Sequence, residues 1–148
     1  EEMFWTIASL TGVHVKLDGG ISVKGMYNRE THLISVNAEY SWTQKIKTLI
    51  HEYAHHLVNA EAIQMDRQME EMVVESVSFI VSDYLGFDTS NYSIPYLGSW
   101  GKDTDTLWRC GELIQRLSSK IIQQYTQRES AQSAFFNTEN EEDIKHVG

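Results

Sequence analysis

A pair of histidines with helical spacing is the feature of this sequence that most constrains its fold. His51 and His55 enclose Glu52 in the pattern His-Glu-x-x-His. Residues at i and i+4 leave the same face of an α-helix one turn apart, so both imidazoles can approach one metal ion. The segment begins with a capping-box pattern over residues 41–44, and its apolar side chains recur with the helical period. We therefore predict a helix over residues 42–59.

The histidine pair could also arise by chance. Histidine contributes 6 of the 148 residues, and composition alone produces this pattern in about 2% of such chains. The amphipathic helical context favours metal ligation instead. We expect His51 and His55 to bind one Zn²⁺ ion, with Glu52 placed to reach a water molecule on the metal.

A second predicted helix, with Asp66 as its N-cap and its end at Leu85, offers a third ligand. A polar stripe with helical spacing crosses this mostly apolar segment and consists of Glu71, Glu75, Ser78 and Ser82. Carboxylates are costly to bury unless they are paired or bound to a metal. One of the two glutamates could therefore be the ligand, while the other accepts the Nδ1–H of a ligating histidine.

The same acidic residues also fit two roles that involve no metal. The stripe could simply be the solvent-facing side of the helix. Glu70 and Glu71 could complement the positive end of the helix dipole, since both stand near the N-terminus of the segment. The sequence leaves both roles open.

The remaining segments predict a small α+β domain. Alternating apolar residues indicate strands over residues 13–17, 21–27 and 32–36, which we expect to pair as an antiparallel sheet packed on the histidine-bearing helix. Further helices are expected over residues 1–10 and from residue 103 or 104 to about Gln127. We assign residues 1–128 to one domain and expect the polar, acidic residues 129–148 to form a disordered tail.

Charge and composition exclude several classes of protein. The formal net charge of −9 disfavours direct nucleic-acid binding by this segment. No apolar run approaches the ~18 residues of a membrane span. A single cysteine, Cys110, leaves no internal disulfide and favours a reducing compartment, so we expect a cytoplasmic protein. Because the chain begins at Glu1 without a methionine, we expect it to be part of a longer protein.

Two stretches of the sequence resemble a known family. They are HEYAHH at residues 51–56 and EEMVVESVSFIVSDYLGFDTSNYSIPYLGSW at residues 70–100. About residues 20–126 resemble the ImmA/IrrE-like zinc metallopeptidases, which are zincins with an HExxH helix, and within them the ArdC/LtrC-like antirestriction branch. That branch has an E-x-x-x-E-S-V-A helix and an L-G-x-D-T-S-x-Y-S segment. Ser78 stands here where the branch usually has alanine.

The resemblance implies a zincin-like fold and a set of site residues. It implies that His51, His55 and Glu71 bind zinc and that Glu52 is the catalytic glutamate. Thermolysin-like spacing would instead favour Glu75 as the third ligand; we prefer Glu71, with Glu75 hydrogen-bonded to a ligating histidine. Candidates for stabilising the oxyanion are Tyr92 and Tyr96.

The function implied is that of a zinc-dependent endopeptidase. Glu52 would be the general base, and the substrate, a peptide of a regulatory protein, would lie along an open sheet edge at residues 32–36. The family suggests a role in mobile elements and an N-terminal single-strand-DNA-binding domain outside this segment. The alternative is a non-proteolytic antirestriction or binding module on a zinc-containing scaffold, and a weaker one is a purely structural metal site.

Overall fold

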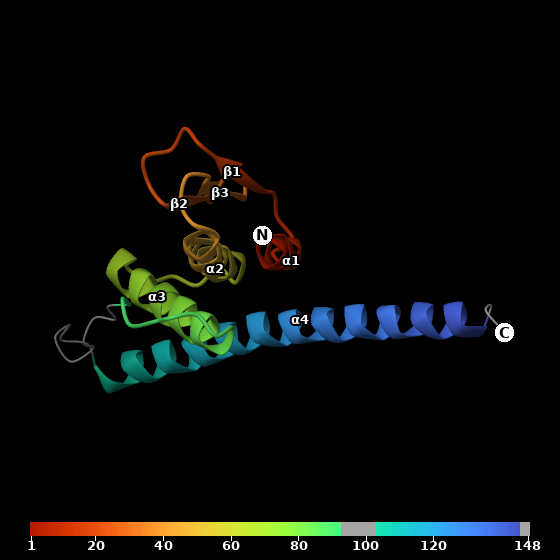
Figure 1. Cartoon of the computed structure of the whole chain (residues 1–148). Helices are drawn as coiled ribbons and strands as arrows, with labels where there is room; N and C mark the ends of the chain where they lie inside the picture. The colour runs from red at the N-terminus through yellow and green to blue at the C-terminus, as the bar shows by residue number, and fades with distance from the viewer. Residues whose placement is uncertain (93–102, 146–148) are drawn as a thin grey trace.

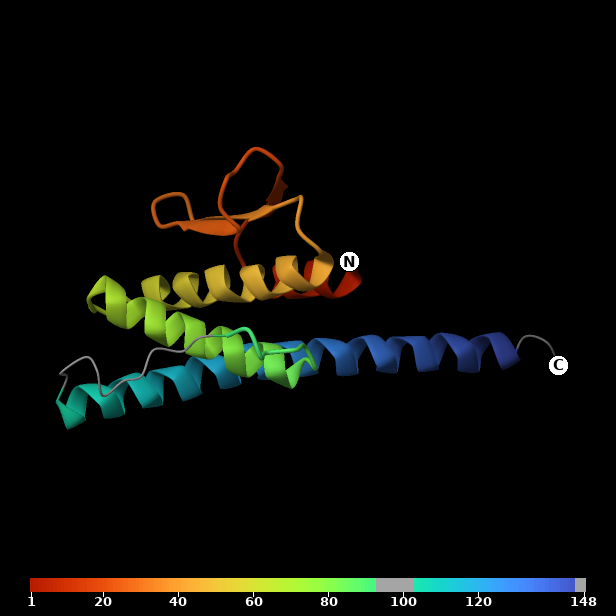
Figure 2. The same ribbon diagram turned by 60° about the vertical axis from the view of Figure 1, so that its left-hand side comes forward.

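Helix α2 (Trp42–Ala60) lies at the centre of the structure, with a small sheet on one side and the long helices α3 (Arg67–Tyr84) and α4 (Thr104–Lys145) on the other (Figures 1 and 2). The short helix α1 (Glu2–Leu10) packs beside α2. The computed structural model describes the backbone of residues 1–92 and 103–145, and the side chains of residues 1–92 and 103–136. This part of the chain is an α+β fold, as predicted.

Local capping signals correctly predict where the two central helices begin and end. Ser41 accepts a hydrogen bond from the Gln44 N–H (3.3 Å), and Asp66 accepts one from the Met69 N–H (2.8 Å). Gly86 follows α3 with a positive φ of 82°, a conformation that glycine adopts without strain. The predicted bounds of α2 and α3 are therefore confirmed to within a residue or two.

The sheet differs from its prediction, because it is mixed rather than antiparallel. The strands are β1 (Val15–Asp18), β2 (Gly25–Asn28) and β3 (Leu33–Asn37), in the order β1-β3-β2. β2 and β3 form an antiparallel hairpin, but β1 pairs parallel to β3. Residues 19–24 carry the chain past β3 to its far edge, so β1 and β2 are not neighbours.

This strand order also overturns the predicted substrate edge. Residues 33–37 form the central strand, and their N–H and C=O groups pair with strands on both sides. A central strand has no free edge for another chain to join. β3 is the most buried of the strands, with Ile34 and Val36 at 0% exposure, which explains its central place.

The hydrophobic core lies between the helices and under β3. α2 contributes apolar side chains to contacts with α1, α3 and the sheet, and α4 closes the far side of α3. The Tyr53 hydroxyl lies 3.1 Å from the Leu10 carbonyl oxygen and 2.9 Å from Gln124 Oε1, so it links α2 with α1 and α4. This packing fixes the orientation of the face of α2 that carries the two histidines.

Helix α4 is longer than predicted. The sequence predicts an end near Gln127 and a disordered tail after residue 129, but the helix continues to Lys145 and extends beyond the rest of the molecule (Figure 2). Its described core contacts, such as Leu117 and Ile121, come from its first half. Residues 112–145 contain neither proline nor glycine, so no local signal ends the helix. Within the described part of the chain, no helix is long and apolar enough to cross a membrane.

Gly25 is required where β2 passes over α2. A Cβ atom at this position would lie 2.4 Å from Thr48 Cγ2 and 3.1 Å from the Ser35 carbonyl oxygen. We predict that Gly25→Ala lowers the free energy of unfolding by about 1–3 kcal/mol, as overpacking usually does. Urea denaturation measures this change.

Gly111, on α4, provides the matched control. A Cβ atom there meets nothing within 4 Å, so Gly111→Ala should leave stability unchanged or raise it by about 0.5–1 kcal/mol through helix propensity. Equal stability of the two variants would contradict the close approach of β2 to α2.

Candidate metal centre

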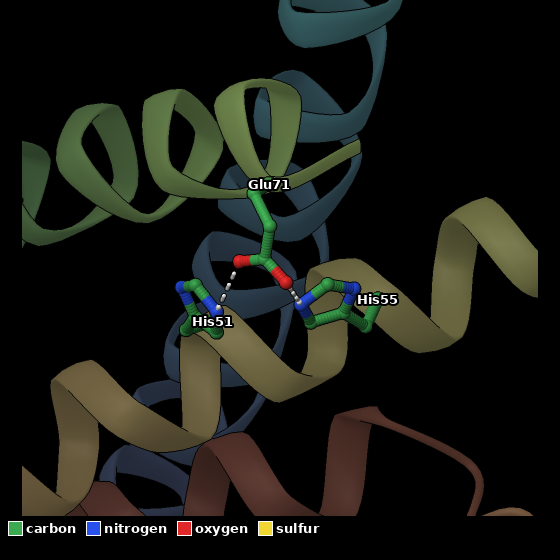
Figure 3. Close-up of side chains that lie close together, drawn as sticks. All are labelled: His51, His55 and Glu71. Carbon is green, nitrogen blue, oxygen red and sulfur yellow. Dashed lines mark ion pairs between the residues drawn. The ribbon is translucent and has the colours of Figure 1, made fainter. Parts of the chain in front are cut away.

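The two histidines of α2 face one carboxylate of α3. His51 Nε2 lies 3.6 Å from Glu71 Oε2, and His55 Nε2 lies 3.5 Å from Glu71 Oε1 (Figure 3). The donor atoms of His51, His55 and Glu71 all lie within 4.8 Å of one another. A tetrahedral zinc with bonds of ~2.0–2.1 Å holds its ligands about 3.4 Å apart, so this donor set fits the ion.

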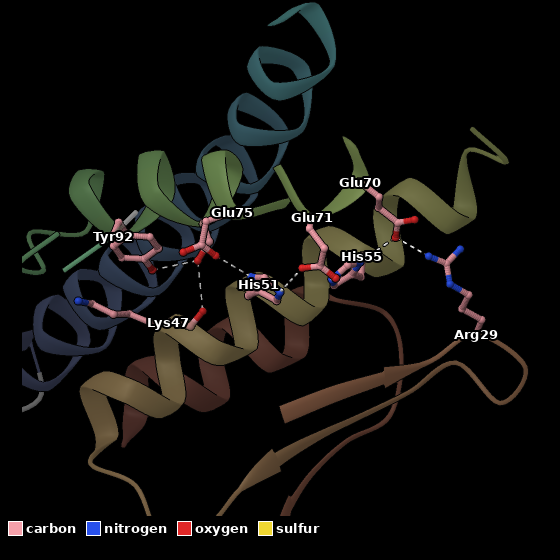
Figure 4. Close-up of polar contacts among 9 residues, drawn as sticks. Arg29, Lys47, His51, His55, Glu70, Glu71, Glu75 and Tyr92 are labelled. Atoms are coloured by element: carbon pink, nitrogen blue, oxygen red, sulfur yellow. Dashed lines mark hydrogen bonds and ion pairs between the residues drawn. The ribbon is translucent and has the colours of Figure 1, made fainter. Parts of the chain in front are cut away.

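Each histidine is held in place by a second carboxylate on its other ring nitrogen. His51 Nδ1 lies 3.1 Å from Glu75 Oε2, and His55 Nδ1 lies 2.7 Å from Glu70 Oε1 (Figure 4). A carboxylate that accepts the Nδ1–H keeps that proton on Nδ1 and leaves Nε2 free as a ligand. Glu71 therefore faces both Nε2 atoms and Glu75 faces His51 Nδ1, and their roles as metal ligand and as partner of a ligating histidine stay predictions.

Glu70 is a residue whose role the sequence analysis missed. The sequence indicates it only as a partner of the helix dipole, but it is buried, and it binds both His55 and the Arg29 guanidinium. The antiparallel run of α2 and α3 contains the signal that could have found it. Since the two helices run in opposite directions, residues before Glu75 on α3 fall near residues after His51 on α2, which brings Glu70, five residues before Glu75, near His55.

The charges around these groups determine which of them are ionised. Burial raises the pKa of Glu70, but hydrogen bonds from Arg29 and His55 outweigh that effect, and its pKa is lowered overall. Glu70 is therefore an ionised acceptor for the His55 Nδ1–H. Burial lowers the pKa of His51, while the hydrogen bond to Glu75 and nearby negative charges raise it above its usual value. In the metal-free protein, these acidic neighbours attract positive charge to the site.

Glu52 lies beside the histidine pair in a different environment. Its side chain is buried, with 8% exposure, and burial raises the pKa of its carboxyl despite the positive influence of His51 and His55. The backbone of Tyr27 also lowers this pKa, as the weakest of these influences. Glu52 thus carries a raised pKa, which suits a group that takes up and releases a proton.

A cleft of about 550 Å³ opens beside the centre. It runs along α2 between the segment that leads into β2 and the face of α3, and its walls include His51, Glu52 and Glu75. Tyr92 also lines the cleft, and its hydroxyl lies 3.0 Å from Ser78 Oγ and 3.1 Å from Ser82 Oγ. A role of Tyr92 at the oxyanion stays a prediction, and Tyr96 lies outside the described residues.

Comparison with known proteins gives little guidance to function. No protein-family model and no solved structure matches the chain. An uncharacterized protein of Bacillus anthracis, pXO2-81, is 32% identical over 86 residues, which are 57% of this chain and 15% of that protein. The chain therefore spans a small part of the relative's length.

Glu71 contacts the Nε2 atoms of the histidines, whereas Glu70 and Glu75 contact their Nδ1 atoms. These two kinds of contact predict different losses of zinc affinity. Glu71→Ala removes a ligand atom and should nearly abolish zinc binding. Glu70→Ala and Glu75→Ala leave all three ligands but release one histidine ring each, so zinc affinity should fall by about 10–100-fold. Competition with a chromophoric chelator measures these constants.

Glu112, exposed on α4, provides the control. Glu112→Ala removes the same charge away from the site and should bind zinc like the unmodified chain. A larger loss for Glu75→Ala than for Glu71→Ala would exchange the two assignments. Thermal melting of each variant separates loss of ligation from loss of the fold.

Proposed function

We propose that this chain is a zinc metallopeptidase domain of the ImmA/IrrE type, close to its ArdC/LtrC-like branch. His51, His55 and Glu71 would hold the ion, and Glu52 would act as general base in the hydrolysis of a peptide bond. One observation carries the proposal: three donor atoms converge while both histidine Nδ1 atoms are bound by other carboxylates. Neutral imidazoles with fixed Nε2 atoms are typical of metal sites rather than of surface histidines.

The chemistry follows from the position of Glu52 at the cleft. A bound zinc ion would act as a Lewis acid on the scissile carbonyl and would lower the pKa of water. Glu52 takes a proton from the attacking water and returns it to the leaving amine. Its raised pKa favours both transfers near neutral pH.

The free edge of β2 is the surface on which a substrate peptide would lie. The Lys24 carbonyl accepts a hydrogen bond from the Asn37 N–H of β3 (2.9 Å). Backbone groups alternate along a strand, so those of Gly25 and Tyr27 point to the opposite, free edge. Residues 22–25 line the cleft beside Glu52. A peptide that joins this edge as an added strand would pass the general base.

The proposal also covers the substrate protein and the biological setting of this domain. The substrate would be a regulatory protein, as in the family that the sequence resembles, and the setting would be an antirestriction or regulatory system of a mobile element in the cytoplasm. A preceding DNA-binding domain would then bring this domain to its target.

The first test replaces the general base. Glu52→Gln keeps the size of the side chain but cannot accept the proton, so peptide cleavage should fall by at least ~10²–10⁴-fold while zinc content and melting temperature stay unchanged. Cleavage of a peptide library is measured together with zinc content. His55→Ala is the companion variant and should lose both zinc and activity.

Two results would count against the proposal. Equal cleavage by Glu52→Gln and the unmodified chain would identify a contaminating protease. An antirestriction effect that survives in Glu52→Gln would show that this effect needs no hydrolysis, and the non-proteolytic binding module would replace the peptidase.

The acidic charge of the chain predicts weak contact with nucleic acid. With a formal net charge of −9, the segment should bind single-stranded DNA no more tightly than ~10⁻⁴–10⁻⁶ M at physiological salt, the range of non-specific binders. Fluorescence anisotropy measures this at two salt concentrations. Nanomolar binding would contradict the charge argument and favour a DNA-binding role.

A further inference from the structure

Two lysines line the cleft. Lys24 comes from the segment before β2, and Lys47 comes from α2, one turn before His51. Figure 4 shows Lys47 and Tyr92 at one end of the row of side chains and Glu70 with Arg29 at the other, with His51, His55 and Glu71 between them. Lys47 therefore lies next to the candidate metal centre but outside its hydrogen bonds (Figure 4), and Lys24 lines the same cleft.

Neither lysine forms a close ion pair among the described residues, although Lys47 lies near enough to Asp88 to help lower the pKa of that carboxyl. Lys47 is half-buried; its Nζ donates to the Asp88 backbone carbonyl and lies 5.3 Å from the centroid of the Tyr92 ring. Lys24 is exposed. Among the described residues, no carboxylate forms an ion pair with either ammonium group.

This positive charge stands out in a strongly acidic chain. The acidic members of the cleft are Glu52 and Glu75, and both are engaged with the histidine site. The remaining polar walls near the lysines are uncharged and include Gln44, Thr48 and Asn91. Two ammonium groups in a cleft whose other walls are uncharged attract a negatively charged ligand group, which would compete with the Asp88 carboxylate for Lys47.

The spacing of Lys47 and His51 along α2 indicates how far the positive charge lies from the scissile bond. One helical turn from His51 to Lys47 corresponds to about 6 Å along the axis. An extended peptide covers this length with about two residues, at roughly 3.3 Å each. A carboxylate held by Lys47 would therefore belong to a peptide residue close to the bond that is cut.

We propose that Lys24 and Lys47 form a subsite for a peptide carboxylate within about two or three residues of the scissile bond. The carboxylate is either the side chain of an aspartate or glutamate or the free C-terminus of the peptide. This inference rests on the proposed peptidase function and adds a substrate class to it: acidic peptides, or peptides cut near their C-terminus.

Binding is tested without turnover. The zinc-supplemented full chain with Glu52→Gln is titrated into fluorescein-labelled peptides that differ by one Glu-for-Gln replacement, each made with a C-terminal carboxylate or amide. A peptide with a correctly placed carboxylate should bind about tenfold more tightly than its neutral counterpart, as expected for a charge-assisted contact. The difference should shrink as salt rises.

Charge-reversal variants test whether Lys24 and Lys47 bind the peptide carboxylate. In Lys47→Glu and Lys24→Glu, each made in the same background, the advantage of the acidic peptide should disappear. Arg128→Glu, an equal change of charge at an exposed position on α4, should keep it. Lys47→Met guards against misfolding, since it loses the charge but keeps an apolar chain against Tyr92, and it should also abolish the difference.

The outcomes separate this inference from the proposed function. Cleavage by the unmodified chain with equal binding of acidic and neutral peptides overturns the subsite and leaves the peptidase. A preference that persists in both lysine variants also overturns it. If no peptide binds or is cut, the proposed function fails and the subsite fails with it. If a C-terminal amide weakens binding, the bound carboxylate is the C-terminus of the peptide. If only the Glu-for-Gln replacement changes binding, the bound carboxylate is a side chain.

Discussion

The antiparallel packing of α3 against α2 is the contact on which the candidate site depends. It sets Glu70, Glu71 and Glu75 against the two histidines, so each imidazole has a carboxylate on Nδ1 and shares Glu71 on Nε2. Several carboxylates so close together repel one another, and the cost of desolvating them is large unless cations or donors compensate. The arrangement is therefore reasonable for a helix pair that holds a divalent ion and would be unfavourable as simple core packing.

The β2–β3 hairpin fixes the same site from the other side. Arg29, in its turn, binds Glu70, and the backbone of Tyr27 lies near enough to the Glu52 carboxyl to lower its pKa slightly. Gly25 lets the strand approach α2 closely enough for that second contact. A sheet that only covered an apolar face of α2 would need none of these polar contacts. The hairpin thus lies beside Glu52 and, through Glu70, positions one of the two histidines.

The sequence predicts those features of the fold and the site that depend on neighbouring residues, and it misses features that depend on residues far apart in the chain. The starts of α2 and α3 are predictable because Ser41 and Asp66 cap through neighbours three residues away. The spacing of His51 and His55 is likewise local. Strand order is not local, since alternation shows that a strand is half-buried but not which strand it joins. Glu70 was missed for a similar reason, because its partners Arg29 and His55 lie on other elements.

The solvent exposure of the ligand set bears on whether the site is structural or catalytic. A structural zinc is enclosed by four protein ligands, whereas a catalytic zinc keeps one position open. Within the described residues, no fourth histidine, cysteine or acidic side chain joins His51, His55 and Glu71 as a donor. Glu71 has a side chain that is 47% exposed, and the cleft begins at His51. A centre with three donors beside an open cleft, with a buried carboxylate of raised pKa next to it, is the arrangement that the proposed peptidase requires.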